Sequence, residues 1–333
     1  MEPFNWGIIS TAKIGVTKVI PALQRSRHGR VAAIASRNLA DAEGVAAQLG
    51  IPKAYGSYEE LLADPTIDAI YNPLPNHLHV PWSIKALEAG KPVLCEKPLA
   101  LNAAEARTLI AARDKSGKLA AEAFAVRFHP QWMRARELVQ DGRIGTLRLV
   151  QGMFSYMLTN PANVRNNVEI GGGGLYDIGC YPIAMARYLY GAEPERVVAL
   201  IDRDPAMKVD RLASVTMEFA QGQASFGCAT QLAPYQRMQI FGTTGRIEIE
   251  IPFNAPPDRP CRLFVDDGRT LDGSGAVVET FATMDQYSAQ GDAFAEAVRG
   301  LAPLEFPLED AVRNMQVLDA AYRSGATGNW ETT

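Results

Sequence analysis

Short apolar segments alternate with helical patterns over the first 124 residues, and this alternation limits the possible folds more than any other feature of the chain. Helical segments stop at glycines such as Gly50 and Gly90, as helices commonly do. Strands separated by helices form βαβ units, and their right-handed crossovers give a parallel sheet. We therefore predict an α/β fold with a doubly wound parallel sheet. Its strands are expected at Trp6–Ile9, Val31–Ala35, Ala54–Gly56, Ile67–Tyr71, Pro92–Cys95 and Leu119–Ala123.

The second half of the chain has a different pattern, in which apolar and polar residues mostly alternate. Turn signals such as Gln221-Gly222 and Thr244-Gly245 separate several of these segments. We predict an α+β domain built on a large, open, mainly antiparallel sheet. Because such a sheet buries one face and can offer the other to a second subunit, we expect a homo-oligomer. The strands are expected at Leu147–Met157, Glu195–Ile201, Ala213–Phe219, Gln223–Thr230, Arg237–Phe241 and Arg246–Ile251.

Length, charge and cysteine content exclude several classes of protein. The 333 residues fit two domains of roughly 100–200 residues each, which we place at 1–124 and 125–333. A net charge of −4 argues against a nucleic acid or an anionic membrane as partner. The four cysteines form no Cys-x-x-Cys pair, which disfavours a zinc site and fits a reducing compartment. With neither a signal peptide nor a long apolar run in sight, we expect a cytoplasmic protein without membrane or metal partners.

The turn after the first strand has the strand–turn–helix context of a dinucleotide-binding fingerprint. Ser10 and Ala12 occupy the first two glycine positions of that motif, and only Gly15 is kept. On this segment alone, a turn without any nucleotide is favoured. After the second strand comes Ser36-Arg37 with no acidic residue, and a guanidinium suits a 2′-phosphate. This favours NADP(H), with an exposed arginine opening the next helix as the alternative.

Two more segments follow strands of the predicted parallel sheet and so share its ligand-binding edge. Glu96, Lys97 and Pro98 close the strand 92–95, and partial desolvation of Lys97 there would lower its pKa and suit it to proton chemistry. A surface salt bridge followed by a turn at Pro98 is the alternative, and a proline here can favour a cis peptide bond. The loop 72–79 contains His77 and His79, for which a capping or cofactor-facing role is favoured over metal binding because the spacing is poor.

One helix in the second half follows four consecutive glycines, 171–174, which would let another molecule approach the backbone closely. Asp177 and Tyr181 lie one turn apart on this helix and share a face. A tyrosine can act as acid or base when a cation lowers its pKa, and a nearby carboxylate can orient substrate hydroxyls. The alternative is that Tyr181 packs in the core while Asp177 pairs with a neighbouring arginine.

Four segments together resemble the Gfo/Idh/MocA oxidoreductase family, and the resemblance covers nearly the whole chain. The turn after the first strand, taken with Ser36-Arg37, is most similar to the NADP-dependent branch of that family. This branch includes glucose–fructose oxidoreductase, aldose–aldose oxidoreductase, D-xylose dehydrogenase and dimeric dihydrodiol dehydrogenase. The segments are Gly7–Gly15, Pro75–His79, Gly90–Pro98 and Gly172–Tyr181.

The resemblance implies an NADP(H)-binding Rossmann domain and a substrate-binding domain whose open sheet forms a homodimer or homotetramer. It implies that Lys97 lies beside the nicotinamide and the substrate hydroxyl, that Tyr181 is the acid/base, and that Asp177 binds or orients the substrate. A cis Lys97-Pro98 bond is also expected. Arg127, Arg165 and Tyr287 are expected to line the substrate pocket together with Asp177 and Tyr181. The cofactor-binding residues are expected to be Ser10, Thr11, Ala12, Lys13, Ile14, Ser36, Arg37, Asn38, Leu74, Pro75, Asn76, His79, Glu96 and Lys97.

The implied activity is hydride transfer between C1 of an aldose in its pyranose form and nicotinamide C4, which gives a lactone or, in reverse, a reduced sugar. An aldose–aldose oxidoreductase that keeps its cofactor bound is one version of this activity. The alternatives are an NADP(H)-binding regulator without turnover and a trans-dihydrodiol or other carbonyl reductase. The presence of Lys97, Asp177 and Tyr181 together argues against the regulator. The sugar, the direction of the reaction and the choice between dimer and tetramer stay open.

Overall fold

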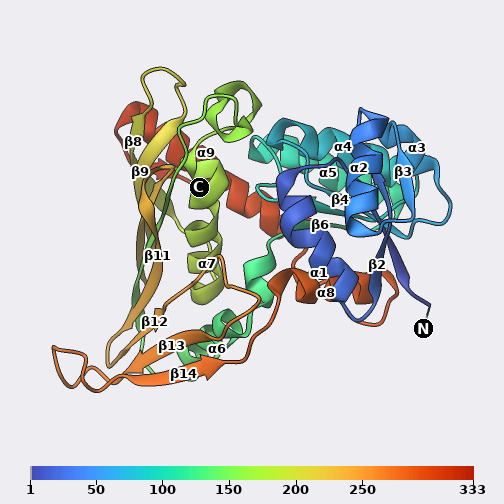
Figure 1. The fold of residues 1–333 in the computed structure, drawn as a ribbon. Coiled ribbons are helices and arrows are strands. Elements are labelled where there is room, and N and C mark those ends of the chain that lie inside the picture. Colours follow the sequence, from blue (N-terminus) through green and yellow to red (C-terminus); the bar gives the residue numbers. More distant parts are fainter. Residues whose placement is uncertain (1) are drawn as a thin grey trace. The chain divides into compact units, whose positions relative to one another are not determined.

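The structure is a computed structural model that describes residues 2–333 (Figure 1). The chain forms two compact units. The first unit comprises Met1–Ala125 and Gln286–Val312, and the second comprises Val126–Asp285 and Arg313–Thr333. The predicted domains, 1–124 and 125–333, are each continuous in sequence. In the structure, Gln286–Val312 belongs to the first unit although it lies in the second half of the chain.

The first unit contains a six-stranded sheet with the order β3-β2-β1-β4-β5-β6. Every neighbouring pair is parallel, so the predicted doubly wound sheet is confirmed. Trp6, Ile34 and Tyr71 are fully buried, because helices cover both faces of such a sheet. The strands are β1 (Phe4–Ile9), β2 (Gly29–Ala35), β3 (Lys53–Tyr55), β4 (Ala69–Asn72), β5 (Val93–Glu96) and β6 (Ala120–Ala123).

The helices of the first unit begin and end where local chemistry favours it. The Asn102 side chain accepts the N–H of Glu105 and caps α5, which ends at Gly117 in the left-handed conformation. Asn38 and Gly50 begin and end α2 in the same way. A π-helical turn over Gly15–Val19 leads into α1. The helices are α1 (Ile20–Arg25), α2 (Leu39–Leu49), α3 (Tyr58–Ala63), α4 (His79–Glu88), α5 (Ala103–Ser116) and α8 (Gln286–Val298).

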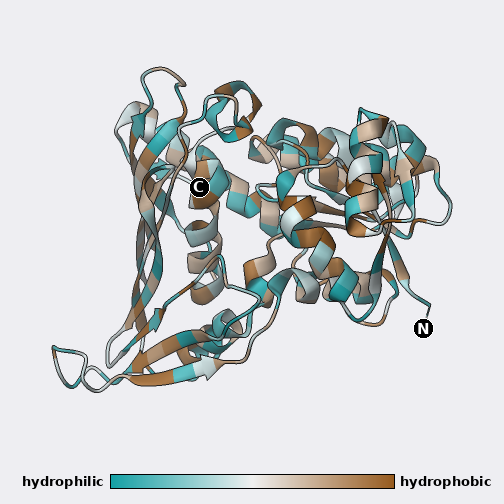
Figure 2. Ribbon diagram, in the orientation of Figure 1, coloured by the Kyte–Doolittle hydropathy of each residue, from teal (hydrophilic) through white to brown (hydrophobic). Residues whose placement is uncertain are grey.

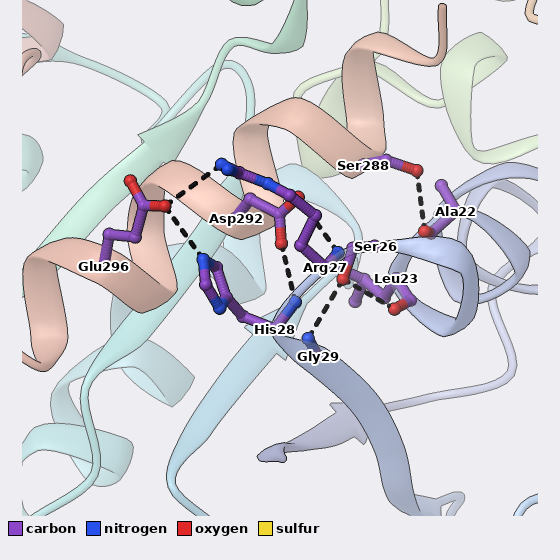
Figure 3. A network of polar contacts seen from close by, with 9 residues as sticks. All are labelled: Ala22, Leu23, Ser26, Arg27, His28, Gly29, Ser288, Asp292 and Glu296. Carbon is purple, nitrogen blue, oxygen red and sulfur yellow. Dashed lines mark hydrogen bonds and ion pairs between the residues drawn. The ribbon is translucent and has the colours of Figure 1, made fainter. Parts of the chain in front are cut away.

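Helix α8 belongs to the first unit because it is fastened to the segment that joins α1 to β2 (Figure 3). The Asp292 carboxylate accepts the main-chain N–H groups of Arg27 and His28 at 3.1 and 3.0 Å. The Glu296 carboxylate lies 2.8 Å from the His28 ring, and the Ser288 hydroxyl donates to the carbonyl of Ala22 at 2.7 Å. These contacts join segments far apart in the sequence, so the sequence pattern alone does not reveal them.

The second unit contains a nine-stranded sheet with the order β14-β13-β12-β11-β7-β10-β9-β8-β15. All neighbours are antiparallel except β7 and β10, which are parallel, so the predicted mainly antiparallel sheet is confirmed. Apolar and polar residues alternate along its strands (Figure 2). The six predicted strands are β7 (Leu147–Met157), β8 (Arg196–Arg203), β9 (Asp210–Phe219), β10 (Gly222–Ala229), β11 (Gln231–Gly242) and β12 (Arg246–Ile249); β13 (Cys261–Asp266), β14 (Val277–Phe281) and β15 (Glu331–Thr332) were not predicted.

The remaining α-helices of the described residues are α6 (Pro130–Gln140), α7 (Cys180–Tyr190) and α9 (Leu308–Thr327). Helix α7 lies against one face of the large sheet (Figure 1). The side chains of β8 to β10 that point to this face, such as Val197, Val215 and Cys228, are buried. On the opposite face Leu200 is 76% exposed, so this face of the sheet is open to solvent within residues 2–333.

Candidate functional site

Four of the segments singled out in the sequence lie at the carboxyl ends of strands in the first sheet. Ser10 follows β1, Ser36 follows β2, the loop 73–78 follows β4, and Lys97 follows β5. The strand order reverses between β1 and β4, and ligands of doubly wound sheets bind at the carboxyl edge beside such a switch point. The first unit therefore carries a candidate nucleotide site at this edge.

The turn after β1 fits a dinucleotide despite its missing glycines. Ser10 has a φ of +81°, a region that glycine enters freely and other residues rarely adopt. Its hydroxyl accepts the N–H of Ala12 at 3.3 Å and thereby fixes this conformation. Residues 10–14 are at least partly exposed, so a pyrophosphate can reach the start of the helix that follows.

The end of β2 presents a cation where an NAD-preferring site would present an acid. Arg37 is exposed, whereas Ser36 is buried and its hydroxyl accepts the N–H of Asn38 at 3.3 Å. The Asn38 side chain caps α2 through Ala40. Of these three predicted cofactor residues, Arg37 thus has the side chain most open to a ligand.

The loop that carries Lys97 is fastened on both sides of that residue. The Tyr71 hydroxyl donates to Glu96 Oε1 at 2.6 Å in a buried contact. Burial raises the pKa of Tyr71 well above its ordinary value, so the phenol stays protonated and donates. The Lys97-Pro98 peptide bond is cis, as predicted. The N–H of Leu99 donates to Glu122 Oε1 at 2.9 Å.

His79 lies at the start of α4 with only 1% of its surface exposed. Its two ring nitrogens lie 2.6 Å from the carbonyl oxygen of Leu74 and 2.8 Å from that of Pro98. The histidine therefore links the loop after β4 to the loop after β5, and its predicted contact with the cofactor stays a prediction. Within residues 2–333, no three His, Cys, Asp or Glu side chains are placed to hold a metal ion.

In the second unit, Asp177 lies at the centre of a polar cluster. Arg165 Nε lies 2.9 Å from Asp177 Oδ1, and the Tyr156 hydroxyl donates to Asp177 Oδ2. The negative charge of Asp177 raises the pKa of Arg165 above its already high value. The structure thus shows the arginine partner considered in the sequence analysis, and that arginine is itself one of the predicted pocket residues. A carboxylate held by two donors has its position fixed and keeps lone pairs for a substrate hydroxyl.

Tyr156 is a member of this cluster that sequence reasoning missed. It lies on β7 and shares a face with Phe154, two residues earlier, because side chains alternate along a strand. Phe154 and Phe253 pack their rings 5.8 and 5.4 Å from that of Tyr181 and fix its orientation. The alternation within β7 was the available signal for Tyr156, whereas Phe253 lies in a segment without a strand pattern.

The glycines before this helix are explained by the chain's own packing. A Cβ on Gly172 would lie 2.6 Å from the carbonyl oxygens of Arg165 and Asn167. Gly173 has a φ of +123°, and a Cβ there would collide with the carboxylate of Asp210. Within the second unit, the close approach that these glycines allow is made by neighbouring protein atoms.

Asp210 is buried next to the start of the same helix, and its burial makes the stability of the protein depend on pH. Its carboxylate accepts the N–H of Leu175 at 2.6 Å and the hydroxyl of Tyr322 at 3.0 Å, but burial still raises its pKa to about 6. Since the folded protein holds this proton more tightly than the unfolded chain, the stabilisation is complete below about pH 4 and lost as the pH rises through about 6.

We therefore expect Asp210→Asn to gain stability relative to the native protein as the pH rises from 4 to 7. The change over this pH range should amount to about 2 kcal/mol, since a shift of one pKa unit corresponds to about 1.4 kcal/mol and part of the effect falls below pH 4. Urea unfolding of both proteins across this pH range measures the difference. A difference in the free energy of unfolding that is constant with pH would contradict the raised pKa.

The remaining predicted residues fall in one unit or the other. Tyr287 packs against the core of the first unit, which also holds Lys97. Arg127 is buried in a short 3₁₀ turn of the second unit, which also holds Arg165, Asp177 and Tyr181. The structure thus brings Asp177 and Arg165 into contact, and it groups the predicted cofactor residues at one edge of the first sheet.

Comparisons with known proteins agree with this architecture. Residues 4–124 match the model of an oxidoreductase family with an NAD-binding Rossmann fold, and residues 132–248 match the GFO/IDH/MocA C-terminal domain. The chain is 47% identical to an uncharacterized oxidoreductase of Rhizobium meliloti over the full length of both. It is 41% identical to D-xylose 1-dehydrogenase (NADP(+)) 2 of Haloferax volcanii, over 97% of this chain and 98% of that one.

A solved structure extends the likeness. KijD10, a 3-ketoreductase from Actinomadura kijaniata crystallised with NADP and TDP-benzene, superposes with a TM-score of 0.90 at 29% identity. The match covers 97% of this chain and 98% of KijD10. Among the helices of residues 2–333, none combines the length and the apolar character that a membrane crossing requires. The matches to both family models and to these relatives show that the chain is an NAD(P)-dependent oxidoreductase and belongs to the Gfo/Idh/MocA family.

Proposed function

We propose that the protein is an NADP(H)-dependent sugar oxidoreductase that transfers hydride between C1 of a pyranose aldose and nicotinamide C4. The product is a lactone or, in reverse, a reduced sugar. The observation that carries the proposal is the fixed carboxylate of Asp177, one helical turn from Tyr181. Sugars present several hydroxyl donors, which a partly buried, oriented carboxylate accepts well. The likeness to the NADP-dependent xylose dehydrogenase supports the same substrate class.

The chain's own residues divide the work of the proposed reaction. The bound nicotinamide supplies the hydride acceptor or donor. Tyr181 takes the proton of the C1 hydroxyl in oxidation and returns one in reduction. Asp177, held by Arg165 and Tyr156, orients the hydroxyls of the sugar. Lys97 supplies a positive charge at the ligand edge of the first sheet, where it stabilises developing negative charge on oxygen.

Arg37 is proposed to select NADP(H) by pairing with the 2′-phosphate. We expect Arg37→Ala to raise the KM for NADP⁺ about 10–100-fold, because a charge-assisted hydrogen bond contributes about 1.5–3 kcal/mol. The KM for NAD⁺ should stay the same. Arg30→Ala is the matched control, since Arg30 is an exposed arginine at the amino end of the same strand. Equal effects of Arg37→Ala on both cofactors would contradict the assignment.

The proposed function is tested by absorbance in the near ultraviolet. Purified protein is mixed with NADP⁺ and D-xylose or D-glucose, and NADPH formation is followed. Steady NADPH production is expected from an ordinary dehydrogenase. A nicotinamide band that is retained after dialysis and rises on addition of aldose would instead identify an aldose–aldose oxidoreductase with bound cofactor. No signal in either experiment would contradict the aldose assignment.

One observation favours a second candidate, a carbonyl reductase acting elsewhere on a sugar. KijD10, with a TM-score of 0.90, is a 3-ketoreductase. Under this alternative Tyr181 donates a proton to a ketone oxygen. The protein would then oxidise NADPH when a keto sugar is added and would form no NADPH from NADP⁺ and an aldose. A regulator without turnover would show neither reaction although it binds NADP(H).

We also propose a cytoplasmic homodimer or homotetramer formed through the uncovered face of the large sheet. This face is a shallow hollow of about 700 Å³, and its side chains include Leu200, Thr216 and Tyr235. Leu200 and Tyr235 are 76% and 52% exposed, which favours burial against a second subunit. Light scattering of the eluting protein gives the oligomeric state, and a monomer would contradict this proposal.

A further inference from the structure

A single acidic residue, Glu122, lies inside the strand β6 at the edge of the first sheet. Its neighbours along the strand are alanines, and all four strand residues are buried. Only 8% of the Glu122 surface is exposed. An ionised carboxylate is costly to bury, so one in an otherwise apolar strand needs strong hydrogen-bond donors.

One such donor is a main-chain N–H in the loop that carries Lys97. Glu122 pairs with Cys95 across the β5–β6 register, which places it beside the end of β5. Its Oε1 accepts the N–H of Leu99 at 2.9 Å in a buried hydrogen bond. The carbonyl of the same peptide unit, that of Pro98, lies 2.8 Å from His79 Nδ1. Both polar groups of the peptide that joins Pro98 to Leu99 therefore face buried side chains.

The residue before Lys97 is fixed as well, through the contact of Tyr71 with Glu96. Lys97 thus stands between two anchors, while its own side chain is long and rotatable. A flexible side chain is held in a reactive geometry only if its backbone is fixed, and a misplacement of about 1 Å can cost about 100-fold in rate.

We propose that Glu122 is a positioning residue for Lys97, acting through the N–H of Leu99. The inference rests on the proposed role of Lys97 in hydride transfer. Glu122 itself touches neither substrate nor cofactor in this account. Its carboxylate holds the backbone after Lys97 at the carboxyl edge of the sheet, and so keeps the ammonium group where negative charge develops.

The first test removes the acceptor while keeping the volume. We expect Glu122→Met to lower kcat about 10–100-fold, because the buried N–H of Leu99 loses its partner. The Kd for NADP(H) should change less than about twofold, since the rest of the nucleotide site is kept. Glu122→Gln keeps an accepting oxygen at the same position and should restore kcat to within about threefold of the native value.

Asp292→Ala is the matched control. Asp292 is another buried carboxylate of the first unit that accepts main-chain N–H groups, those of Arg27 and His28 (Figure 3). These groups precede β2 at the amino edge of the sheet, opposite the ligand edge. The control should lower the Tm and leave kcat unchanged, which separates loss of stability from loss of positioning.

A double-mutant cycle decides whether Glu122 acts through Lys97. In a Lys97→Met background, measured by single turnover, Glu122→Met should lower the rate by less than about twofold, since residues that act as a unit are non-additive. If Glu122→Met lowered the rate of the Lys97→Met protein as much as it lowers that of the native protein, the inference would be overturned, because Glu122 would then act independently of Lys97. If Glu122→Met fails to fold, a folded Glu122→Gln with kcat reduced by about tenfold or more would overturn it equally. A native rate in Lys97→Met alone would refute the proposed role of Lys97, and this inference with it.

Discussion

Replacing Tyr181 with phenylalanine is expected to lower kcat about 10²–10⁴-fold, the usual contribution of a general acid or base. The hydroxyl is the group proposed to exchange a proton with the substrate oxygen. The ring would stay in place, because Phe154 and Phe253 pack against it through apolar contacts. The Kd for NADP(H), measured by fluorescence titration, should stay the same because the nucleotide edge belongs to the first unit.

Tyr190→Phe is the control for this change. Tyr190 lies at the end of the same helix, and its hydroxyl donates to the carbonyl of Gln223. Losing that hydrogen bond should cost about 1 kcal/mol of stability and leave kcat unchanged. If Tyr181→Phe kept native kcat with an aldose substrate, the proton transfer would have to be assigned to another residue.

Replacing Lys97 with methionine is the second change with a large expected effect. We expect kcat to fall about 10²–10³-fold, because a preorganised positive charge near a developing oxyanion contributes on this scale. Methionine keeps much of the length and apolar stem of lysine, so the loop should keep its structure. Rates at saturating NADP⁺ and aldose measure the loss.

Lys91→Met is the matched control, because Lys91 stands at the opposite end of β5. Its ammonium donates to the carbonyl oxygens of Asp64 and Ile67, both at 2.7 Å. Removing these contacts leaves two buried acceptors unpaired and should lower the Tm without changing kcat. Equal losses of kcat from the two substitutions would show that a general destabilisation, and not the charge of Lys97, controls the rate.

The parallel sheet could be predicted from the sequence because its strands are buried on both faces and alternate with well-capped helices. Gly50, for example, stops a helical pattern in the sequence and ends α2 in the structure. The strands of the second sheet were predicted where apolar and polar residues alternate, as in Leu147–Met157. Strands β13 and β14 were missed for two reasons. A proline-rich segment precedes β13, and both strands are defined by pairing with neighbouring strands of the sheet, which the local sequence does not reveal.

Long-range contacts explain the rest of what sequence reasoning could not supply. The assignment of α8 to the first unit depends on Asp292 meeting the main chain of Arg27 and His28. In the sequence, Glu122 is a single acidic residue in an alanine-rich strand, and only the structure shows its hydrogen bond with the N–H of Leu99. The four glycines before Leu175 indicate a close approach, and only the structure shows that Asp210 and two carbonyl groups make it.

The candidate site residues could be proposed from the sequence because chemistry-bearing side chains follow strands or share a helix face. Their separate roles could not be read in the same way. Tyr156 reaches Asp177 from β7, and Arg165 reaches it from the short turn at 164–166. No periodic pattern in the sequence brings these two residues together. What the sequence presents as a pair on one helix is in the structure a cluster with a fixed carboxylate.

The most direct test of the central claim is a hydride-transfer experiment with D-xylose and D-glucose that carry deuterium at C1. The protein is incubated with NADP⁺ and each sugar, and the nicotinamide cofactor is analysed by mass spectrometry. The account predicts NADPH that contains one deuterium and a lactone that has lost it. Formation of unlabelled NADPH would place the reaction at another carbon, and the absence of any NADPH from both sugars would contradict the assignment of this chain as an aldose oxidoreductase.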